Sequence, residues 1–314
     1  MIIRTVIRTL ALPLAGIVAW SRFVVSHDRN LPAPVPADDE LAVPTPAGTV
    51  AVHRAGSGPA TPVVLVHSVN AAASAYEMRP LFEHWRRERP VLAPDLPGFG
   101  ASERGDRRYT PEAMAEALVA VLEGTGPAHV VALSLGCEFA ARVALERPDL
   151  VVDLTLISPT GLGRRQDGGP PAVVGTVLRA PLVGQALYDL LVTQRSIRWF
   201  LSRSFVGDVD HGLVAYAWAT AHQPGARFAP AAFLDGTLFT ADAATHLYDP
   251  LDVPVLVVHD RDSYSTFERV ADFVAADDRR RVVRIPATLG LPHFEGLEAT
   301  VSAIEAFWAD VGIG

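Results

Sequence analysis

The chain has 314 residues, of which 49% are hydrophobic and 20% charged, so it can bury one large core or a core with a small accessory domain. The formal charge of −8 provides no basic field for a polyphosphate backbone, which excludes nucleic acid as an expected partner. The sequence contains no lysine, which excludes Schiff-base and P-loop lysine chemistry. The single cysteine, Cys137, allows neither an internal disulfide nor a cysteine-based metal cluster.

Residues 1–30 form an N-terminal apolar segment of separate character. In a helix, its arginines Arg4, Arg8 and Arg22 fall on one narrow stripe, with bulky apolar residues over the remainder. The apolar run is too short for a comfortable transmembrane span. Three interpretations of residues 1–25 stay open: a helix lying on a membrane surface, a signal peptide without a clear cleavage site, and a helix packed on the protein's own surface. The protein is therefore expected to be membrane-associated or cytoplasmic.

Prolines mark the next segment, residues 31–46. Their spacing favours an extended, semi-rigid connector, so we interpret this segment as a linker. The prolines are Pro32, Pro34, Pro36, Pro44 and Pro46. Beyond the linker we expect a core built from residues 47–160 and 249–314.

Strand-like runs recur along the expected core. Most are continuous stretches of valine, leucine and isoleucine, which are typical of parallel strands covered on both faces. They lie at residues 49–55, 62–68, 90–95, 129–134, 151–158, 253–260 and 281–286. Helical patterns at 111–124, 137–148 and 298–312 alternate with them. The pattern predicts an α/β fold with a doubly wound, mostly parallel sheet.

The alternation stops between residues 161 and 248. This region contains apolar segments of helical period and no evident parallel strand, and we interpret Arg164 and Arg165 near its start as part of a solvated loop. An all-helical insertion at this point is expected to form a cap over the carboxyl edge of the sheet, where α/β proteins bind ligands. Its many aromatic residues are typical of helix packing and also suit the roof of an apolar pocket.

Five motifs follow one another in a fixed order: LVHSVNAAASAYEMRPL, VLAPDLPGFGASE, VVALSLGCEFAARVALERP, VPVLVVHDRDSY and GLPHFEGLE. Together they resemble the α/β-hydrolases that carry an inserted cap. The resemblance covers roughly residues 48–312 apart from the cap, and five motifs in order are far more specific than one. It implies the α/β-hydrolase form of the predicted sheet.

Ser134 lies in the sequence ALSLG, between a strand-like run and a helical pattern. The resemblance implies that it is the nucleophile of a G-x-S-x-G elbow, in which strand and helix backbones nearly touch. Gly136 supplies the second small residue. Ala132 replaces the first glycine and is still small enough for the turn.

The resemblance also implies partners for the serine. The order nucleophile, acid, histidine places the base at His293, in the loop before the last helix. After the strand at 253–260 the family pattern G-x-x-D maps Asp262 onto the acid, with Asp260 as the alternative.

Two backbone N–H groups are expected to stabilise an oxyanion. One belongs to Leu135, directly after the proposed nucleophile. The second belongs to Val69, in the loop where the family has His-Gly-x and this chain has His67 and Ser68. Both of these residues are predicted to line the site.

The sequence thus predicts a serine hydrolase that cleaves a carboxylic ester or related acyl substrate of moderate hydrophobicity, with no metal and no organic cofactor. A perhydrolase or haloperoxidase, a C–C bond hydrolase and an acyltransferase use the same residues and remain alternatives, as does a sensor that binds a ligand without turnover. Serine in place of aspartate at the elbow argues against dehalogenase and epoxide-hydrolase chemistry. The oligomeric state is left open.

Overall fold

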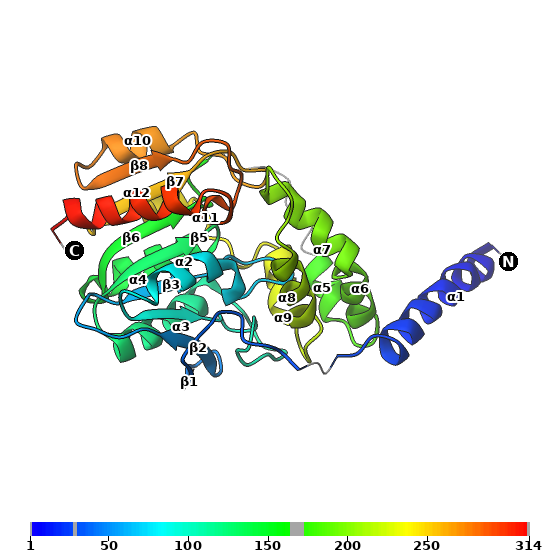
Figure 1. Cartoon of the computed structure of the whole chain (residues 1–314). Helices are drawn as coiled ribbons and strands as arrows, with labels where there is room; N and C mark the ends of the chain where they lie inside the picture. Colours follow the sequence, from blue (N-terminus) through cyan, green and yellow to red (C-terminus); the bar gives the residue numbers. More distant parts are fainter. Residues whose placement is uncertain (1, 28–29, 164–172, 313–314) are drawn as a thin grey trace.

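The computed structural model describes the backbone of residues 2–27, 30–163 and 173–312, with side chains from Pro13 onward (Figure 1). The predicted solvated loop at Arg164 and Arg165 lies outside the described residues.

An eight-stranded sheet in the order β1-β2-β4-β3-β5-β6-β7-β8 forms the centre of the molecule. Pairs β1–β2 and β2–β4 are antiparallel, and all other neighbouring pairs are parallel. The strands are β1 (Asp39–Val43), β2 (Val50–Ala55), β3 (Val63–Val66), β4 (Val91–Pro94), β5 (Ala128–Leu133), β6 (Val151–Ile157), β7 (Val255–His259) and β8 (Arg280–Arg284). Each of the seven predicted strands overlaps an observed one, which confirms the mostly parallel α/β sheet.

Strand β1 corrects the linker prediction. Residues 39–43 pair with β2 along their whole length, so this part of the segment 31–46 belongs to the sheet and is not a linker. The reason is local: DELAV contains no proline, and Pro44 follows directly after the last paired residue. As an edge strand, β1 alternates exposed and half-buried residues instead of showing the apolar run by which the other strands are recognised.

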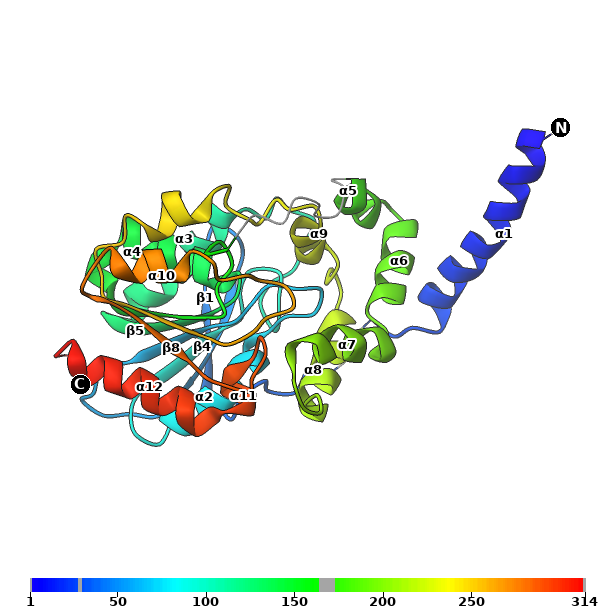
Figure 2. The ribbon, with the colours of Figure 1, turned by 90° about the horizontal axis from the view of Figure 1, so that it is seen from above.

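Helices cover both faces of the sheet. Figure 2 shows α3 (Pro111–Thr125), α4 (Gly136–Glu146) and α10 (Val270–Ala275) on one face, with α2 (Arg79–Trp85) and α12 (Leu297–Asp310) on the other. Each face buries its own hydrophobic cluster. Short helical turns connect these elements: η1 (Ala75–Met78), η2 (Pro148–Leu150), η4 (Ala244–Tyr248) and α11 (Pro292–Glu295).

The described residues between β6 and β7 form five further helices. They are α5 (Val173–Arg179), α6 (Val183–Leu191), α7 (Gln194–Leu201), α8 (His211–Ala221) and α9 (Phe228–Leu234), with the turn η3 (Ser202–Ser204) after α7. We call residues 173–234 the helical insertion. In Figure 1 it stands beyond one end of the strands, on the right.

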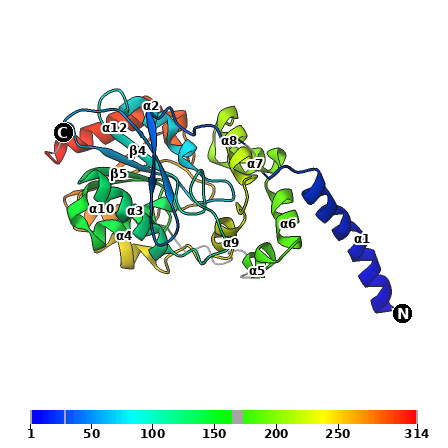
Figure 3. The ribbon, with the colours of Figure 1, turned by 90° about the horizontal axis from the view of Figure 1, so that it is seen from below.

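Helix α1 (Ile2–Phe23) projects from the insertion, away from the sheet (Figures 1 and 3). Its C-terminal end contacts α6, where the fully buried carboxylate of Asp189 accepts hydrogen bonds from Ser21 Oγ (2.5 Å) and His27 Nε2 (2.9 Å). Among the described residues, no helix is long and apolar enough to span a membrane. Association of this segment with a membrane surface stays a prediction.

Candidate active site

Ser134 occupies a sharp turn between β5 and α4. Its φ of +53° lies in the left-handed region that few residues other than glycine adopt, and its N–H donates to the carbonyl of Ile157 at 2.9 Å. A β-carbon on Gly136 would stand 2.4 Å from the His67 carbonyl oxygen, so only glycine fits at this position. Ala132 lies fully buried in β5, between β3 and β6. The local geometry is that of a nucleophile elbow.

A cavity of about 290 Å³ opens at Ser134. Leu135, Ser68, Val69 and Asp262 line it from the sheet side, at the carboxyl ends of the parallel strands. The opposite wall is largely apolar and comes from the helical insertion, including Leu191, Val192, Ile197, Leu201, Leu213 and Phe233. One side of the cavity therefore carries the hydroxyl of Ser134, whose backbone is strained, together with a few polar groups. The other side is an apolar wall.

The loop that carries Val69 is held by a buried carboxylate. Glu77 accepts hydrogen bonds from Ser68 N (2.9 Å) and Asn70 Nδ2 (2.7 Å), while Asn70 Oδ1 accepts from Ala72 N (2.8 Å). Glu77 also lines the cavity and is only 4% exposed. Sequence reasoning missed this residue, because an acid within AYEMRPL gives no motif signal of its own.

His293 lies buried beside this loop. Its Nε2 donates to the backbone carbonyl of Glu77 at 2.7 Å, and its Nδ1 has no partner among the described residues. Burial lowers the pKa of His293 to about 4, because it disfavours the charged imidazolium more than the Glu77 carbonyl favours it. The ring is not part of the cavity wall. No hydrogen bond of the described structure joins it to Ser134 or to Asp262.

The two candidate acids have different surroundings. Asp262 faces the cavity, accepts a hydrogen bond from Tyr264 N at 2.7 Å, and lies so close to the loop before His293 that a β-carbon on Gly290 would stand 3.2 Å from its Oδ2. Burial raises the pKa of Asp262, and the backbone N–H groups around it only partly oppose this shift. Asp260 lies outside the cavity wall, where its carboxylate pairs with the Arg284 guanidinium. The geometry thus favours Asp262 over Asp260.

His67 is a correction to the predicted lining. Its ring is buried and does not form part of the cavity wall, whereas Ser68 does. Nε2 accepts a hydrogen bond from Leu96 N (2.9 Å) and Nδ1 donates to the Ser68 carbonyl (2.5 Å). With both ring nitrogens engaged, His67 supports the loop between β3 and α2 and has no free nitrogen for a substrate.

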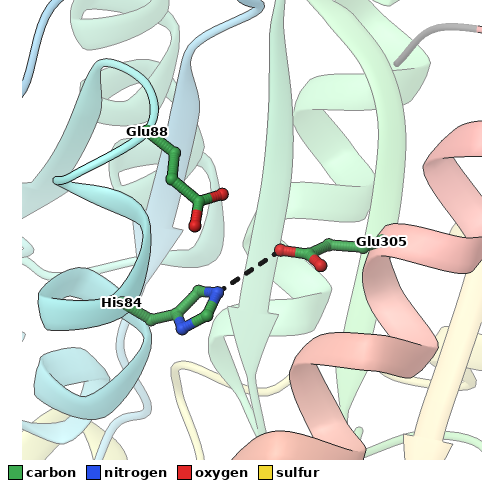
Figure 4. Close-up of side chains that lie close together, drawn as sticks. All are labelled: His84, Glu88 and Glu305. Carbon is green, nitrogen blue, oxygen red and sulfur yellow. Dashed lines mark ion pairs between the residues drawn. The ribbon is translucent and has the colours of Figure 1, made fainter.

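One group of side chains could offer several metal-ligand atoms: His84, Glu88 and Glu305, which lie within 4.8 Å of one another (Figure 4). Glu305 already accepts a hydrogen bond from Trp85 Nε1 at 3.0 Å and faces His84 Nε2 at 3.4 Å. These contacts join α12 to α2 and lie outside the cavity wall. These two contacts explain why the three side chains lie together at a partly exposed contact between helices, and we assign no metal to the group.

Comparisons with known proteins agree with this architecture. A lipase of Mycobacterium tuberculosis, LipV, is 38% identical over 111 residues, 34% of this chain and 41% of its own length. The 2-hydroxymuconate semialdehyde hydrolase of Pseudomonas sp. (strain CF600) is 30% identical over 128 residues, which are 40% of this chain and 44% of the relative. The chain therefore spans less than half the length of these two curated relatives.

A solved structure of similar fold is the serine hydrolase involved in carbazole degradation, CarC. It has a TM-score of 0.70 at 21% identity and covers 86% of this chain and 98% of its own. The family model described as "Alpha/beta hydrolase family" matches residues 63–303, which run from the start of β3 into α12. With the elbow, the parallel sheet and this match in agreement, the chain belongs to the alpha/beta hydrolase family.

Proposed function

We propose that the protein is a serine hydrolase that cleaves a carboxylic ester or a related acyl compound through an acyl-enzyme. The observation that carries this proposal is Ser134, held at a positive φ on the floor of a largely apolar cavity that also contains Asp262. Ser134 Oγ attacks the substrate carbonyl, His293 takes the proton and returns it to the leaving group, and Asp262 orients His293 and stabilises its charged form.

The N–H groups of Leu135 and Val69 form the proposed oxyanion hole. Both residues line the cavity, and within the described part of the chain neither N–H donates to a protein acceptor. An unpaired N–H directed at the reacting carbonyl is worth several kcal/mol of transition-state stabilisation when the surroundings are fixed. The hydrogen bonds from Ser68 N and Asn70 to Glu77 support that fixed geometry on the Val69 side.

His293 must change partner for this mechanism. In the described state Nε2 is bonded to the Glu77 carbonyl and Nδ1 is unpaired, so a turn of the ring is needed to bring Nε2 to Ser134 and Nδ1 to Asp262. The free Nδ1 supports such a turn, because the ring has a hydrogen bond to gain there. We propose that the described arrangement is the resting state of the site.

The cavity wall supports a substrate of moderate hydrophobicity. The helical insertion contributes mainly leucine, valine, isoleucine and phenylalanine to it, and we propose that the insertion acts as a cap that excludes water. C–C bond hydrolysis is the second candidate, because one of the relatives is named as the hydrolase of a semialdehyde rather than of an ester. Perhydrolysis and acyl transfer would use the same residues.

A fluorophosphonate probe tests the nucleophile. We expect the folded protein to be labelled at Ser134 and the Ser134→Ala variant to lose labelling. Ser158→Ala is the matched control, because Ser158 is also buried after a parallel strand at a positive φ but lies outside the cavity wall. Absence of labelling in the folded wild-type protein would contradict the proposal.

Two classes of substrate distinguish ester hydrolysis from C–C bond hydrolysis. We expect p-nitrophenyl esters of intermediate acyl length to be hydrolysed faster than the acetate, since longer chains reach the apolar roof. Turnover of 2-hydroxymuconate semialdehyde without turnover of any ester would instead establish the second candidate.

A further inference from the structure

Exposed large apolar side chains are concentrated in one part of the molecule. Of those that the structure describes, all but Val282 lie on α1 and the two residues after it, on the helical insertion, or on the loops beside the cavity. They are Leu14, Phe23, Val24, Val173, Val177, Leu182, Leu190, Trp199, Phe200, Val206, Phe239 and Tyr264. Figure 1 shows that α1, α5, α6 and α7 lie at the same side of the molecule, beyond the sheet. Where such side chains contact one another at the surface, they mark a candidate interaction site.

At the centre of this region, Trp199, Phe200, Arg203 and Tyr264 form what we call the mouth cluster. The rings of Trp199 and Phe200 pack edge to face at 4.7 Å, and the Tyr264 hydroxyl donates to the Phe200 carbonyl at 2.9 Å. The Arg203 guanidinium lies over the rings of Trp199 (5.4 Å) and Tyr264 (5.7 Å). The residues of the mouth cluster are thus about half exposed and are held to one another by ring, hydrogen-bond and cation–π contacts.

The mouth cluster adjoins the opening of the cavity. Phe200 and Tyr264 belong to the cavity wall and are also 43% and 49% exposed. Phe239 combines the same two properties. Exposed apolar side chains of the mouth cluster are therefore also part of the wall of the proposed active site, beside the polar residues Ser204 and Ser265.

The helical insertion has more arginines than acids although the chain as a whole is negative. Exposed arginines lie at Arg22 on α1, at Arg195 and Arg198 on α7, and at Arg203 in the mouth cluster. The helical insertion, residues 173–234, contains five arginines and three acids; the acids are Asp189, whose side chain is fully buried, Asp208 and Asp210. Arginines whose stems lie along apolar and aromatic groups are suited to phospholipid headgroups.

We propose that this face, formed by the mouth cluster, the exposed side of the insertion and the end of α1, docks on the surface of a bilayer that contains anionic phospholipid. Aromatic rings at headgroup depth, flanked by arginine and continuous with apolar side chains, are the pattern of an interfacial surface. A second copy of the chain fits less well, because a two-fold contact would set the same arginines against each other. It would also close the cavity opening.

The docked orientation deepens the proposed function, on which this step rests. With the mouth cluster against the bilayer, the cavity opens toward lipid, so an ester dissolved in the membrane reaches Ser134 without crossing water. The substrate class is then a lipophilic acyl compound supplied by the membrane.

Vesicle co-sedimentation of the full chain tests the docking surface. We expect binding to vesicles of phosphatidylcholine and phosphatidylglycerol in equal parts, weaker binding to phosphatidylcholine alone, and loss of binding as salt is raised. Trp199→Ser is expected to lower the partition coefficient about tenfold. Val282→Ser is the matched control, because Val282 is the exposed apolar residue outside this face.

Two substitutions that each remove one positive charge test the electrostatic part of the proposal independently. Arg195→Gln is expected to lower partition into the mixed vesicles about fivefold, whereas Arg281→Gln, an equally exposed arginine at the edge of the sheet, leaves it unchanged. The thermal unfolding midpoint of each of the four variants is measured to check that it folds. Equal partition of each variant and its control, or no partition of the wild-type chain, would overturn the proposal.

Two further outcomes are distinguished in the same series. Self-association without vesicles that Trp199→Ser abolishes would overturn the proposal in favour of a second copy. For the membrane-supplied substrate, the rate on a long-chain ester carried in mixed vesicles, divided by the rate on a short soluble ester, is expected to fall in Trp199→Ser. Partition is measured without substrate, so a failure of the proposed hydrolysis and a failure of docking give different results.

Discussion

Glu77 connects the two sides of the proposed site. Its carboxylate holds Ser68 N and Asn70, next to the Val69 N–H, while its backbone carbonyl holds His293. The residue touches no reacting atom in the proposed mechanism, so we regard it as a positioning residue. The sequence alone did not identify Glu77 as a site residue. Its contacts form only because the chain folds back at η1 and brings Glu77 next to the loop after β3, and no sequence motif predicts this fold.

We expect Glu77→Gln to lower kcat for a soluble ester by about tenfold or more while KM changes little. Ser68 N donates to Oε2 of Glu77 and Asn70 Nδ2 donates to Oε1. A glutamine replaces one of these two oxygens by an NH2 group that cannot accept, so one buried donor loses its partner at a cost of about 1–3 kcal/mol. Steady-state kinetics of the variant measures the split between kcat and KM.

The control for Glu77 is Glu83→Gln. Glu83 lies on α2, is about half exposed, and pairs with Arg79 on the surface. It is expected to leave both kinetic constants unchanged. Equal effects of the two substitutions would rule out a positioning role for Glu77.

The burial of His293 sets the pH at which the proposed base is lost. The neutral ring is the active form, and burial lowers its pKa to about 4 from an ordinary 6.5. We expect kcat/KM, which reports the free enzyme, to stay high through pH 6 and to fall as the pH approaches 4. A pH profile with a soluble ester measures this. The exposed His246→Gln variant should give the same profile, and an acid limb near 6.5 would contradict the assignment.

The same shift affects stability with a definite sign. Between pH 6.5 and about 4 the unfolded chain binds a proton at His293 that the folded chain does not, so the free energy of unfolding falls as the pH is lowered through this window. Above pH 6.5 the contribution is fully present. Urea unfolding at a series of pH values measures it, and a titration of His293 near 6.5 in the folded protein would remove the effect.

At the scale of elements, the sequence indicated a strand, a tight turn and a helix around Ser134, and the structure has β5, a residue at positive φ and α4 at these positions. ALSLG was sufficient because its residue sizes reflect a local contact: the backbones of β5, α4 and the end of β3 meet at Gly136. The edge strand β1 was missed for the opposite reason. Its five residues alternate in exposure and bury little, and their pairing with β2 is a tertiary contact.

Two glycines at helix ends provide a matched test of this constraint. Gly136→Ala places a β-carbon 2.4 Å from the His67 carbonyl oxygen, a backbone atom that cannot move alone, so we expect a loss of about 2 kcal/mol or more in the free energy of unfolding. Gly124→Ala, in α3, meets no atom within 4 Å. It is expected to be neutral or to stabilise by up to about 1 kcal/mol. Chemical denaturation measures both, and a similar loss at both sites would show that helix propensity rather than contact decides.

For the molecule as a whole, the five ordered motifs were enough for the family and for the sheet, because those residues build turns and strand ends that recur in one fold. The sequence predicted a helical region between the strands that became β6 and β7, and described residues of the insertion line one wall of the cavity. That the insertion acts as a cap stays a proposal. The contacts that join the insertion to the core, among them Arg104 to Thr220 and Tyr188 to Ala71, link residues far apart in sequence and follow no local pattern. The attachment of α1 to α6 through Asp189 was likewise beyond sequence reasoning.

That attachment gives a prediction about the molecule as a whole. The Asp189 carboxylate is fully buried in α6 and accepts from Ser21, His27 and Gln185, so it fastens the end of α1 to the insertion that roofs the proposed site. Asp189→Ala removes the shared acceptor, and each buried donor left unpaired costs about 1–3 kcal/mol in the attached form. We expect α1 to detach and trypsin to cleave faster after the exposed Arg22.

Asp208→Ala, at an exposed acid of the same insertion, is the control and should be cleaved at the wild-type rate. Mass spectrometry of the digest over time distinguishes cleavage after Arg22 from general unfolding, because only the latter exposes the buried Arg280. Equal cleavage after Arg22 in the two variants would mean that the apolar contacts between α1 and α6 hold the helix without Asp189. Faster cleavage in Asp189→Ala alone would establish that a single buried carboxylate couples the N-terminal helix to the roof of the cavity.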